Sequence, residues 1–389
     1  ETFFAEHWER QPLVVPRGEA GRFDDLLSEA DVERLVCSTG IRYPAFRLVK
    51  EGAQIDPRAY TRDIPWRPPI TGAADVGRVL AEWEAGATIV LQALHLNWRP
   101  VAAFCRDLER ALGQPVQTNA YYTPRGSQGF AVHHDTHDVF VLQVAGEKSW
   151  LVYEPLLELP LRQQRYGKEL GEPGEPTHEL VLRAGDTLYL PRGWLHQAET
   201  SGTDSLHLTV GINPYTWMDA FKGALEDCAD ELGFRHAVPV DGIGAEDLLE
   251  RLREQLDSDD VARRMRRRFV RTRRSVPDGG LSQLRALAEL GQETPVERSA
   301  TVIADVEADD EGAVLVFEGK EVRFPALARP DLEFCAEAEE PFRPADLPGD
   351  LDGEGRLVLV RRLVREGFLR VTDASRDGSP PHSDGRAEG

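Results

Sequence analysis

Three residues in the first half of the chain, His133, Asp135 and His196, have the types and spacing of a metal-binding set. If the segment around His133 is a β-strand, His133 and Asp135 point to the same face, because side chains alternate along a strand. His196 would reach the same point from a distant strand, at the end of the apolar run 188–196. Two histidines and one carboxylate on one side of a metal leave its other positions open, as in non-haem Fe(II) oxygenases. The sequence therefore predicts an Fe(II) site with room for a bidentate co-substrate and O2.

Lys148 is one of only five lysines in the chain, and it directly follows an expected turn at Gly146-Glu147. In an antiparallel hairpin, the strand after this turn would carry Lys148 back past the metal-binding strand. An ammonium group that projects into a β-barrel needs an anion. The distal carboxylate of 2-oxoglutarate would be that anion. Without the His133 set, a lysine beside a turn would instead indicate a surface residue.

Three further histidines compete with the assigned ligands. On a strand, His134 would face away from His133, which favours a packing or surface role. His137 shares the face of His133 and Asp135, so a role as a ligand, or as a support for one, is open. His207 lies in the apolar run 206–212, where a core position or a supporting role is favoured over metal binding.

Short strand candidates separated by Gly, Pro and Asp fill residues 1 to about 215, a pattern typical of a sandwich, barrel or jelly roll. A helix with an apolar stripe is expected before them, at 24–37. The strand candidates cover residues 88–94, 117–123, 139–144, 148–153, 179–182, 187–190 and 206–212.

From Thr216 the apolar spacing changes to a helical period, which predicts helices at 217–232, 245–256 and 260–272. A third region has strand patterns at 314–317 and 321–324, a helix pattern at 356–366 and a strand pattern at 367–371. Eight arginines lie within residues 263–274. This run could contact RNA or an acidic partner, but a solvated helix face paired with acidic neighbours is favoured.

The composition excludes several classes of protein. The chain has 389 residues and a net charge of −21, which argues against general nucleic-acid binding and mildly favours basic partners. No stretch approaches the roughly 18 apolar residues of a membrane helix, and the first residues lack a signal-peptide pattern. The four cysteines are far apart without a CxxC motif. They predict free thiols in a reducing cytoplasm rather than disulfides or zinc ligands.

Beyond these patterns, the chain resembles the JmjC-type ribosomal oxygenases, which are related to bacterial arginine hydroxylases and nucleolar histidine hydroxylases. Residues 3–13, 43–50, 123–129 and 188–197 carry the resemblance. It implies a mainly β catalytic domain at 1–215, a double-stranded β-helix of the cupin/JmjC jelly-roll type. An α-helical dimerisation domain at 216–290 and a small α/β winged-helix domain at 291–375 would follow. The composition of the last residues predicts a disordered tail at 376–389.

The resemblance also implies roles for individual residues. By position, His133, Asp135 and His196 would bind Fe(II), and Lys148 would bind the 2-oxoglutarate carboxylate. Asn119 and Tyr121 would line the pocket for the co-substrate or the peptide. Gly211 departs from the pattern, since a small hydroxyl residue is expected there, and this departure affects the prediction of the substrate.

Together these observations predict an Fe(II)- and 2-oxoglutarate-dependent oxygenase that uses O2 to hydroxylate an Arg or His side chain of a ribosomal or other basic protein. The protein would be a cytoplasmic homodimer without membrane association or direct DNA binding. Four alternatives stay open: an oxygenase acting on a small molecule or peptide natural product, a histone-type demethylase, a cupin enzyme that uses a metal without 2-oxoglutarate, and a non-catalytic dimeric cupin binding protein.

Overall fold

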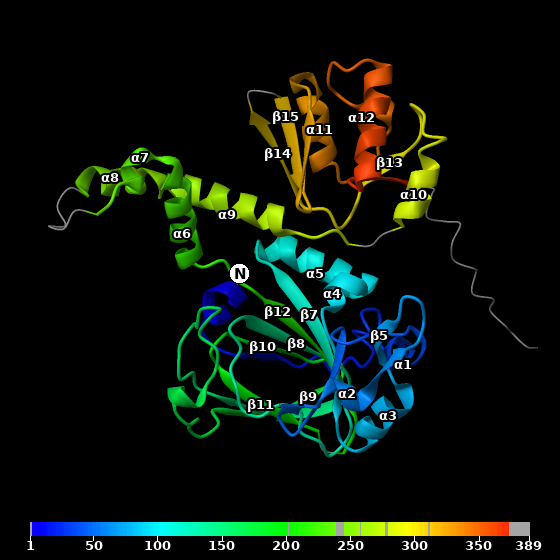
Figure 1. Cartoon of the computed structure of the whole chain (residues 1–389), viewed down its shortest axis with the longest axis vertical. Helices are drawn as coiled ribbons and strands as arrows, with labels where there is room; N and C mark the ends of the chain where they lie inside the picture. Colours follow the sequence, from blue (N-terminus) through cyan, green and yellow to red (C-terminus); the bar gives the residue numbers. More distant parts are fainter. Residues whose placement is uncertain are drawn as a thin grey trace, which may run out of the picture. The chain divides into compact units, whose positions relative to one another are not determined.

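The computed structural model describes residues 2–200, 202–238, 245–256, 258–276, 279–309 and 312–372. The tail predicted at 376–389 lies outside these residues. The chain divides into two compact units, Glu1–Thr216 and Trp217–Gly389 (Figure 1). Among the described residues, no helix is both long enough and apolar enough to cross a membrane.

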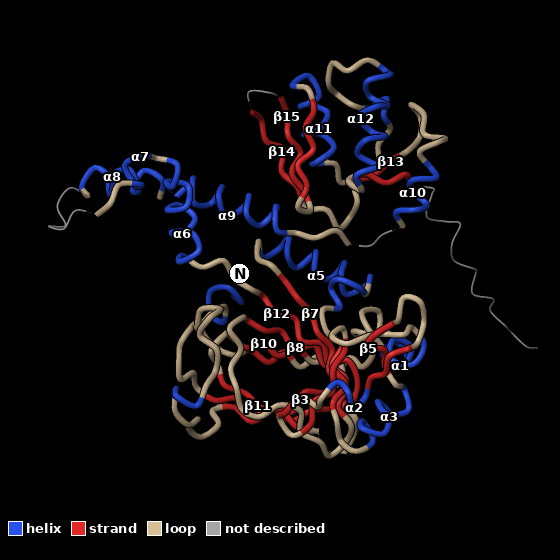
Figure 2. The backbone as a smooth tube through the Cα atoms, in the orientation of Figure 1, coloured by secondary structure: helices blue, strands red, loops and turns tan. Residues whose placement is uncertain are grey.

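The first unit is built on antiparallel strands in the order β1-β10-β8-β12-β7-β6-β2-β3, while β9 and β11 pair with a second stretch of β8. The strands form two layers, one containing β7, β8, β10 and β12 and the other containing β11 (Figure 2). The predicted mainly β domain is therefore confirmed. Its strands are β1 (Leu13–Val15), β2 (Phe46–Lys50), β3 (Ala53–Gln54), β6 (Thr88–Leu91), β7 (Val116–Thr123), β8 (Asp138–Tyr153), β9 (His178–Arg183), β10 (Thr187–Leu190), β11 (Leu195–Glu199) and β12 (Ser205–Ile212).

Strand β8 continues through residues 146–147, so the prediction of a hairpin turn at this point is wrong. Before Gly146 the strand pairs with β10 and β12, and from Glu147 onward it pairs with β9 and β11. Gly146 has a φ of +65°, and a Cβ atom there would lie 1.8 Å from the carbonyl oxygen of Asp204. Glycine at this position lets one strand bend from the first layer into the second. Lys148 thus reaches the interior through a bend rather than a turn.

Helices cover one face of the sheet and pack against its apolar side chains. Val32, Val79 and Val101 lie on three of these helices and are buried in the same core as Leu48 and Leu208. The surrounding elements are η1 (Phe3–His7), α1 (Glu29–Ser38), α2 (Pro57–Tyr60), β4 (Thr61–Ile64), β5 (Ile70–Ala74), α3 (Val76–Glu84), α4 (Leu94–Asn97) and α5 (Arg99–Leu112).

Helix α1 begins later than the predicted residue 24 because a capping box fixes its first turn. The Ser28 hydroxyl accepts from the Asp31 amide, and the Asp31 carboxylate accepts from the Ser28 amide. These reciprocal bonds satisfy two backbone donors that the first helical turn leaves without partners.

The second unit begins with helices and continues into a mixed α/β part. Its helical part comprises α6 (Trp217–Asp227), α7 (Leu232–Arg235), α8 (Glu246–Gln255) and α9 (Ser258–Thr272). The later part comprises α10 (Gly280–Ala286), β13 (Val296–Arg298), β14 (Ala304–Asp309), β15 (Gly312–Phe317), β16 (Lys320–Phe324), α11 (Arg329–Glu337), α12 (Gly353–Glu366) and β17 (Leu369–Val371). Strands β14, β15 and β16 form one antiparallel sheet, and β13 pairs with β17. The Gln283 side chain of α10 accepts from the Val371 amide at 2.7 Å, which ties α10 to this later part.

The arginine run predicted at 263–274 lies on α9 and the residues after it, and most of α9's arginines form ion pairs with acidic side chains. This finding confirms the interpretation of a helix face paired with acidic neighbours. The pairs are Arg264–Asp227, Arg266–Asp305, Arg267–Glu307, Arg268–Asp219 and Arg271–Glu321.

Candidate metal and co-substrate site

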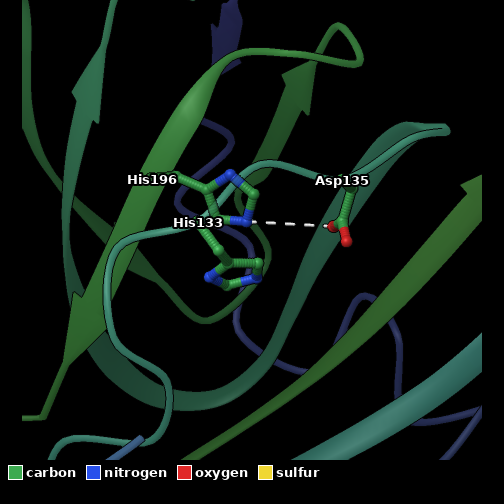
Figure 3. Close-up of side chains that lie close together, drawn as sticks. All are labelled: His133, Asp135 and His196. Atoms are coloured by element: carbon green, nitrogen blue, oxygen red, sulfur yellow. Dashed lines mark ion pairs between the residues drawn. The ribbon is translucent and has the colours of Figure 1, made fainter. Parts of the chain in front are cut away.

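The structure brings His133, Asp135 and His196 together, with one potential ligand atom from each residue within 4.8 Å of the others (Figure 3). His196 lies on β11, whereas His133 and Asp135 lie in the loop that leads into β8. The expectation that these two residues share a strand is therefore wrong. A single antiparallel bridge replaces the strand: the His133 amide donates to the His196 carbonyl at 3.2 Å, and the His196 amide donates back at 2.9 Å.

Backbone carbonyls orient both imidazole rings. Nδ1 of His133 lies 2.8 Å from the Ala131 carbonyl oxygen, and Nδ1 of His196 lies 3.1 Å from the Trp194 carbonyl oxygen. Because a carbonyl oxygen can only accept, each Nδ1 carries a proton, and Nε2 is the ring nitrogen left for a metal. Nε2 of His196 lies 3.9 Å from Oδ2 of Asp135. This arrangement, in which the other ring nitrogen is held by a hydrogen bond, is typical of histidine ligands.

Burial sets the protonation states that metal binding requires. Burial, together with the neighbouring His133, lowers the pKa of His196 to about 4. Burial alone would raise the pKa of Asp135, but His137, His133 and the other surrounding imidazoles outweigh it and lower the pKa overall. A neutral imidazole and an ionised carboxylate are both competent ligands for a divalent metal.

The three residues line one cavity of about 260 Å³ inside the first unit. Most of its wall is apolar or aromatic, but two cationic side chains also reach it. The other lining residues are Arg47, Thr88, Tyr121, Gly129, Phe130, Val139, Val141, Lys148, Trp150, Gln197, Ala198, His207 and Thr209.

Lys148 is a buried cation in this cavity, with 4% of its surface exposed. Its ammonium donates to the Thr123 hydroxyl at 3.0 Å, and that hydroxyl lies 3.1 Å from the Thr88 hydroxyl. Within the described part of the chain, no carboxylate forms an ion pair with it. Burial lowers the pKa of Lys148 to about 7. A buried ammonium that lacks a counter-charge fits a site for the carboxylate of a bound ligand.

Tyr121 and Asn119 contribute differently. The Tyr121 ring lines the cavity and stacks on the His207 ring, with centroids 5.0 Å apart and planes at 9°. Asn119 is not among the lining residues: its side chain accepts from the Ala93 amide at 2.9 Å and forms a hydrogen bond with Tyr121. Asn119 therefore contacts the cavity through Tyr121.

The remaining histidines are sorted by their neighbours. His134 is buried with Nε2 3.2 Å from the Gln164 carbonyl oxygen, which confirms a packing role. His137 packs beside Gly211, where an added Cβ would lie 3.1 Å from Cε1 of the ring, so glycine makes room for the imidazole. His207 lines the cavity, and burial, with help from the Lys148 charge, lowers its pKa well below the usual value.

The sequence patterns did not single out Arg47, Phe130 or Trp150 as site residues, although all three line the cavity. A signal for Arg47 was present, because it alternates with the buried residues Phe46 and Leu48 on β2. An arginine between two apolar residues of a strand points to the opposite face from them. For Phe130 and Trp150 the sequence carries no comparable signal.

With this geometry in place, comparisons with known proteins identify the domain. Residues 93–220 match the family described as "JmjC domain". The chain is 34% identical to Ribosomal oxygenase 1 of Gallus gallus over 256 residues, which are 63% of this chain and 41% of that protein. It is 33% identical to the Bifunctional lysine-specific demethylase and histidyl-hydroxylase NO66 of Drosophila persimilis over 210 residues, 54% of this chain and 29% of that protein.

The fold also matches that of a solved structure, the ribosomal oxygenase YcfD from Escherichia coli in complex with cobalt and 2-oxoglutarate. The two share a TM-score of 0.56 and 18% identity over 94% of this chain and 96% of that chain. At this identity the likeness concerns the fold, and it supports the expected cupin/JmjC core. The chain spans less than half the length of the two curated relatives above. Residues 93–220 therefore carry a JmjC domain, and the chain is similar in sequence to the ribosomal oxygenases.

Proposed function

We propose that the chain is an Fe(II)- and 2-oxoglutarate-dependent oxygenase that hydroxylates a side chain of a protein. One observation carries the proposal: a cavity contains both a 2-His-1-carboxylate set and a buried lysine without a counter-charge. The set suits Fe(II) with open coordination positions, and the lysine suits the second carboxylate of a dicarboxylate co-substrate. The E. coli relative, whose structure holds cobalt and 2-oxoglutarate, shares this fold.

In this function His133, Asp135 and His196 would hold the metal, and Lys148 would bind the distal carboxylate of 2-oxoglutarate. Bound together, Fe(II) and 2-oxoglutarate would supply the O2 activation that adds one oxygen atom to a C–H bond. The Thr123 hydroxyl, which is itself hydrogen-bonded to the Thr88 hydroxyl, accepts from the ammonium and holds it in position. The aromatic rings of Phe130 and Trp150 line the cavity and limit the entry of water.

The substrate we propose is a ribosomal or other basic protein, modified on an Arg or His side chain. The net charge of −21 favours a basic partner through electrostatic complementarity. The names of two similar proteins, a ribosomal oxygenase and a bifunctional lysine-specific demethylase and histidyl-hydroxylase, support a protein substrate, and the second supports His.

We further propose that the helical part of the second unit forms a homodimer and that the later α/β part is a winged-helix domain. On α6, Trp217, Phe221 and Leu225 recur every four residues and are exposed, so they form an unpaired apolar stripe. A second copy would bury this stripe. Light scattering should give twice the chain mass, and Phe221→Glu combined with Leu225→Glu should give a monomer.

The experiment that tests the activity is reconstitution with Fe(II) under anaerobic conditions, followed by O2 and measurement of succinate formed from 2-oxoglutarate. We expect His133→Ala and Lys148→Ala to lose turnover. The exposed His236, on the other unit, offers a matched control, and His236→Ala should keep it. A wild-type protein that binds neither Fe(II) nor 2-oxoglutarate would contradict the proposal and favour a non-catalytic binding role.

A further inference from the structure

Arg47 is a second cation in the cavity, and it is held in place by neighbours that do not neutralise it. It lies on β2, directly opposite Val90 of β6. Its Nε donates to Oε1 of Gln92 at 2.7 Å, while the other end of that amide donates to the Pro44 carbonyl. Its guanidinium carbon lies 5.4 Å from the centroid of the Phe130 ring. The amide and the ring fix the guanidinium while its charge stays uncompensated.

The terminal nitrogens of Arg47 have no hydrogen-bond or ion-pair partner within the part of the chain that the structure describes. Only Nε is used, so the guanidinium keeps the paired N–H groups with which arginine binds planar acceptors. Because Arg47 lines the cavity, these donors are available to a bound molecule.

The bound co-substrate does not use the terminal N–H donors of Arg47. 2-Oxoglutarate has two carboxylates, and under the proposed function one binds the metal while the other pairs with Lys148. Phe130 packs both on Arg47 and, with ring centroids 5.8 Å apart, on the metal-ligand candidate His133. Arg47 and His133 thus pack on the same ring, and both line the cavity into which the reacting side chain of a substrate must come.

We propose that Arg47 determines substrate specificity by donating to an acceptor on the side chain that is hydroxylated. The preferred side chain is then neutral or anionic, such as a neutral imidazole, an amide or a carboxylate. A guanidinium or ammonium side chain is rejected, because like charges in a desolvated site repel strongly. This inference rests on the proposed function. Of the two substrate side chains proposed there, it favours His and excludes Arg.

The first test measures binding directly and needs no turnover. The full chain is loaded anaerobically with Mn(II) and 2-oxoglutarate, and blocked amino acids (N-acetyl, N-methylamide) of His, Asn and Arg are the probes. Paramagnetic relaxation of probe protons reports contact with the metal site. We expect the wild type to relax the protons of the His and Asn probes, and Arg47→Gln to relax them about tenfold less. The Arg probe should be relaxed only by Arg47→Glu.

Two controls separate this role from others. Arg62→Gln makes the same change at an exposed arginine of β4 and should match the wild type. The affinity for 2-oxoglutarate, measured by calorimetry, should stay within about twofold in Arg47→Gln but fall more than tenfold in Lys148→Ala. A tenfold fall in Arg47→Gln would assign Arg47 to the co-substrate and overturn the inference.

The second test identifies the modified residue. Acid-extracted ribosomal proteins are incubated with the Fe(II)-loaded wild type, 2-oxoglutarate and O2, and mass spectrometry locates each added oxygen. Hydroxylation of an arginine, or a wild type that relaxes the Arg probe as strongly as the His probe, would overturn the inference while leaving the oxygenase intact. If 2-oxoglutarate does not bind at all, the proposed function fails first, and that result is distinct from either of these.

Discussion

Two regions of the molecule hold cationic side chains, and they differ in what surrounds each charge. Helix α9 carries a dense run of arginines, and five of them face acidic side chains in ion pairs. The cavity of the first unit holds only Lys148 and Arg47, and neither has a carboxylate partner among the described residues. The arginine run is conspicuous in the sequence, whereas Lys148 and Arg47 are single basic residues far apart along the chain.

The difference shows that a missing partner marks a binding site better than charge density does. An exposed ion pair contributes about 0–1 kcal/mol, so the paired face of α9 needs no ligand to account for it. Of the two cavity cations Lys148 is buried, and a buried cation without a counter-charge costs several kcal/mol and is retained where a ligand supplies the anion. The contrast between the two regions leads to predictions of very different size.

The largest expected effect is on Lys148. Lys148→Met should weaken 2-oxoglutarate binding to Mn(II)-loaded protein by at least ~30-fold, because removing one partner of a buried charge pair costs about 2–5 kcal/mol. The unliganded protein should be no less thermostable, since a buried charge is replaced by an apolar chain of similar length. Calorimetry and thermal unfolding measure the two effects. Arg271→Met on α9 should leave the affinity for 2-oxoglutarate unchanged. Equal losses of affinity in both variants would contradict the distinction between paired and unpaired cations.

The second prediction concerns pH. Because burial lowers the pKa of Lys148 to about 7, the free protein loses the ammonium proton as the pH rises through this value. The ligand needs the charged form, so the affinity for 2-oxoglutarate should be constant below the pKa and fall about tenfold over roughly one unit above it. Calorimetry at a series of pH values measures this. Lys148→Arg keeps its charge and should show no such fall, and a parallel fall in this variant would exclude Lys148 as the titrating group.

The three metal-ligand residues and the buried lysine could be predicted from the sequence, but the backbone conformation that positions them could not. Residue types and spacing were enough for His133, Asp135 and His196, because metal chemistry restricts the choice of ligands. The predicted strand at His133 is a loop held by one bridge to His196, a contact between distant residues that local spacing cannot reveal. The glycine at 146 suggested a turn, but its close approach to Asp204 is visible only once β12 is in place.

Arg47 also shows that local sequence patterns do not reveal contacts between distant residues. Its strand was part of a recognised motif, yet its role depends on Gln92 and Phe130, which come from other elements. Strand boundaries such as β7 and β12 were predicted to within one residue, because β7 alternates in burial and β12 is a short, almost wholly buried run. Local patterns therefore predict elements, while the pairing state of a charge depends on tertiary contacts.

A smaller effect is expected when the support of Lys148 is removed rather than its charge. Thr123→Val deletes the hydroxyl that accepts from the ammonium at 3.0 Å while keeping the side-chain volume. Hydrogen bonds to charged groups contribute about 1.5–3 kcal/mol, part of which the bound carboxylate replaces, so the affinity for 2-oxoglutarate should fall about three- to tenfold. Thr118→Val, also buried on β7 but bonded to Cys105, is the matched control and should bind normally. Equal losses in both variants would indicate a general effect on the strand.

The smallest effect is expected on α9, and it tests the other half of the contrast. Arg266→Gln and Arg271→Gln each remove an exposed pair, so each should lower the free energy of unfolding by less than about 1 kcal/mol, and less at high salt. Because acidic side chains already neutralise this face, neither the wild type nor the variants should bind single-stranded RNA in fluorescence anisotropy. If the wild type binds RNA and these substitutions abolish the binding, RNA phosphates must replace the acidic side chains as partners of the arginines. Ion pairing within the protein would then no longer separate a structural cation from a functional one.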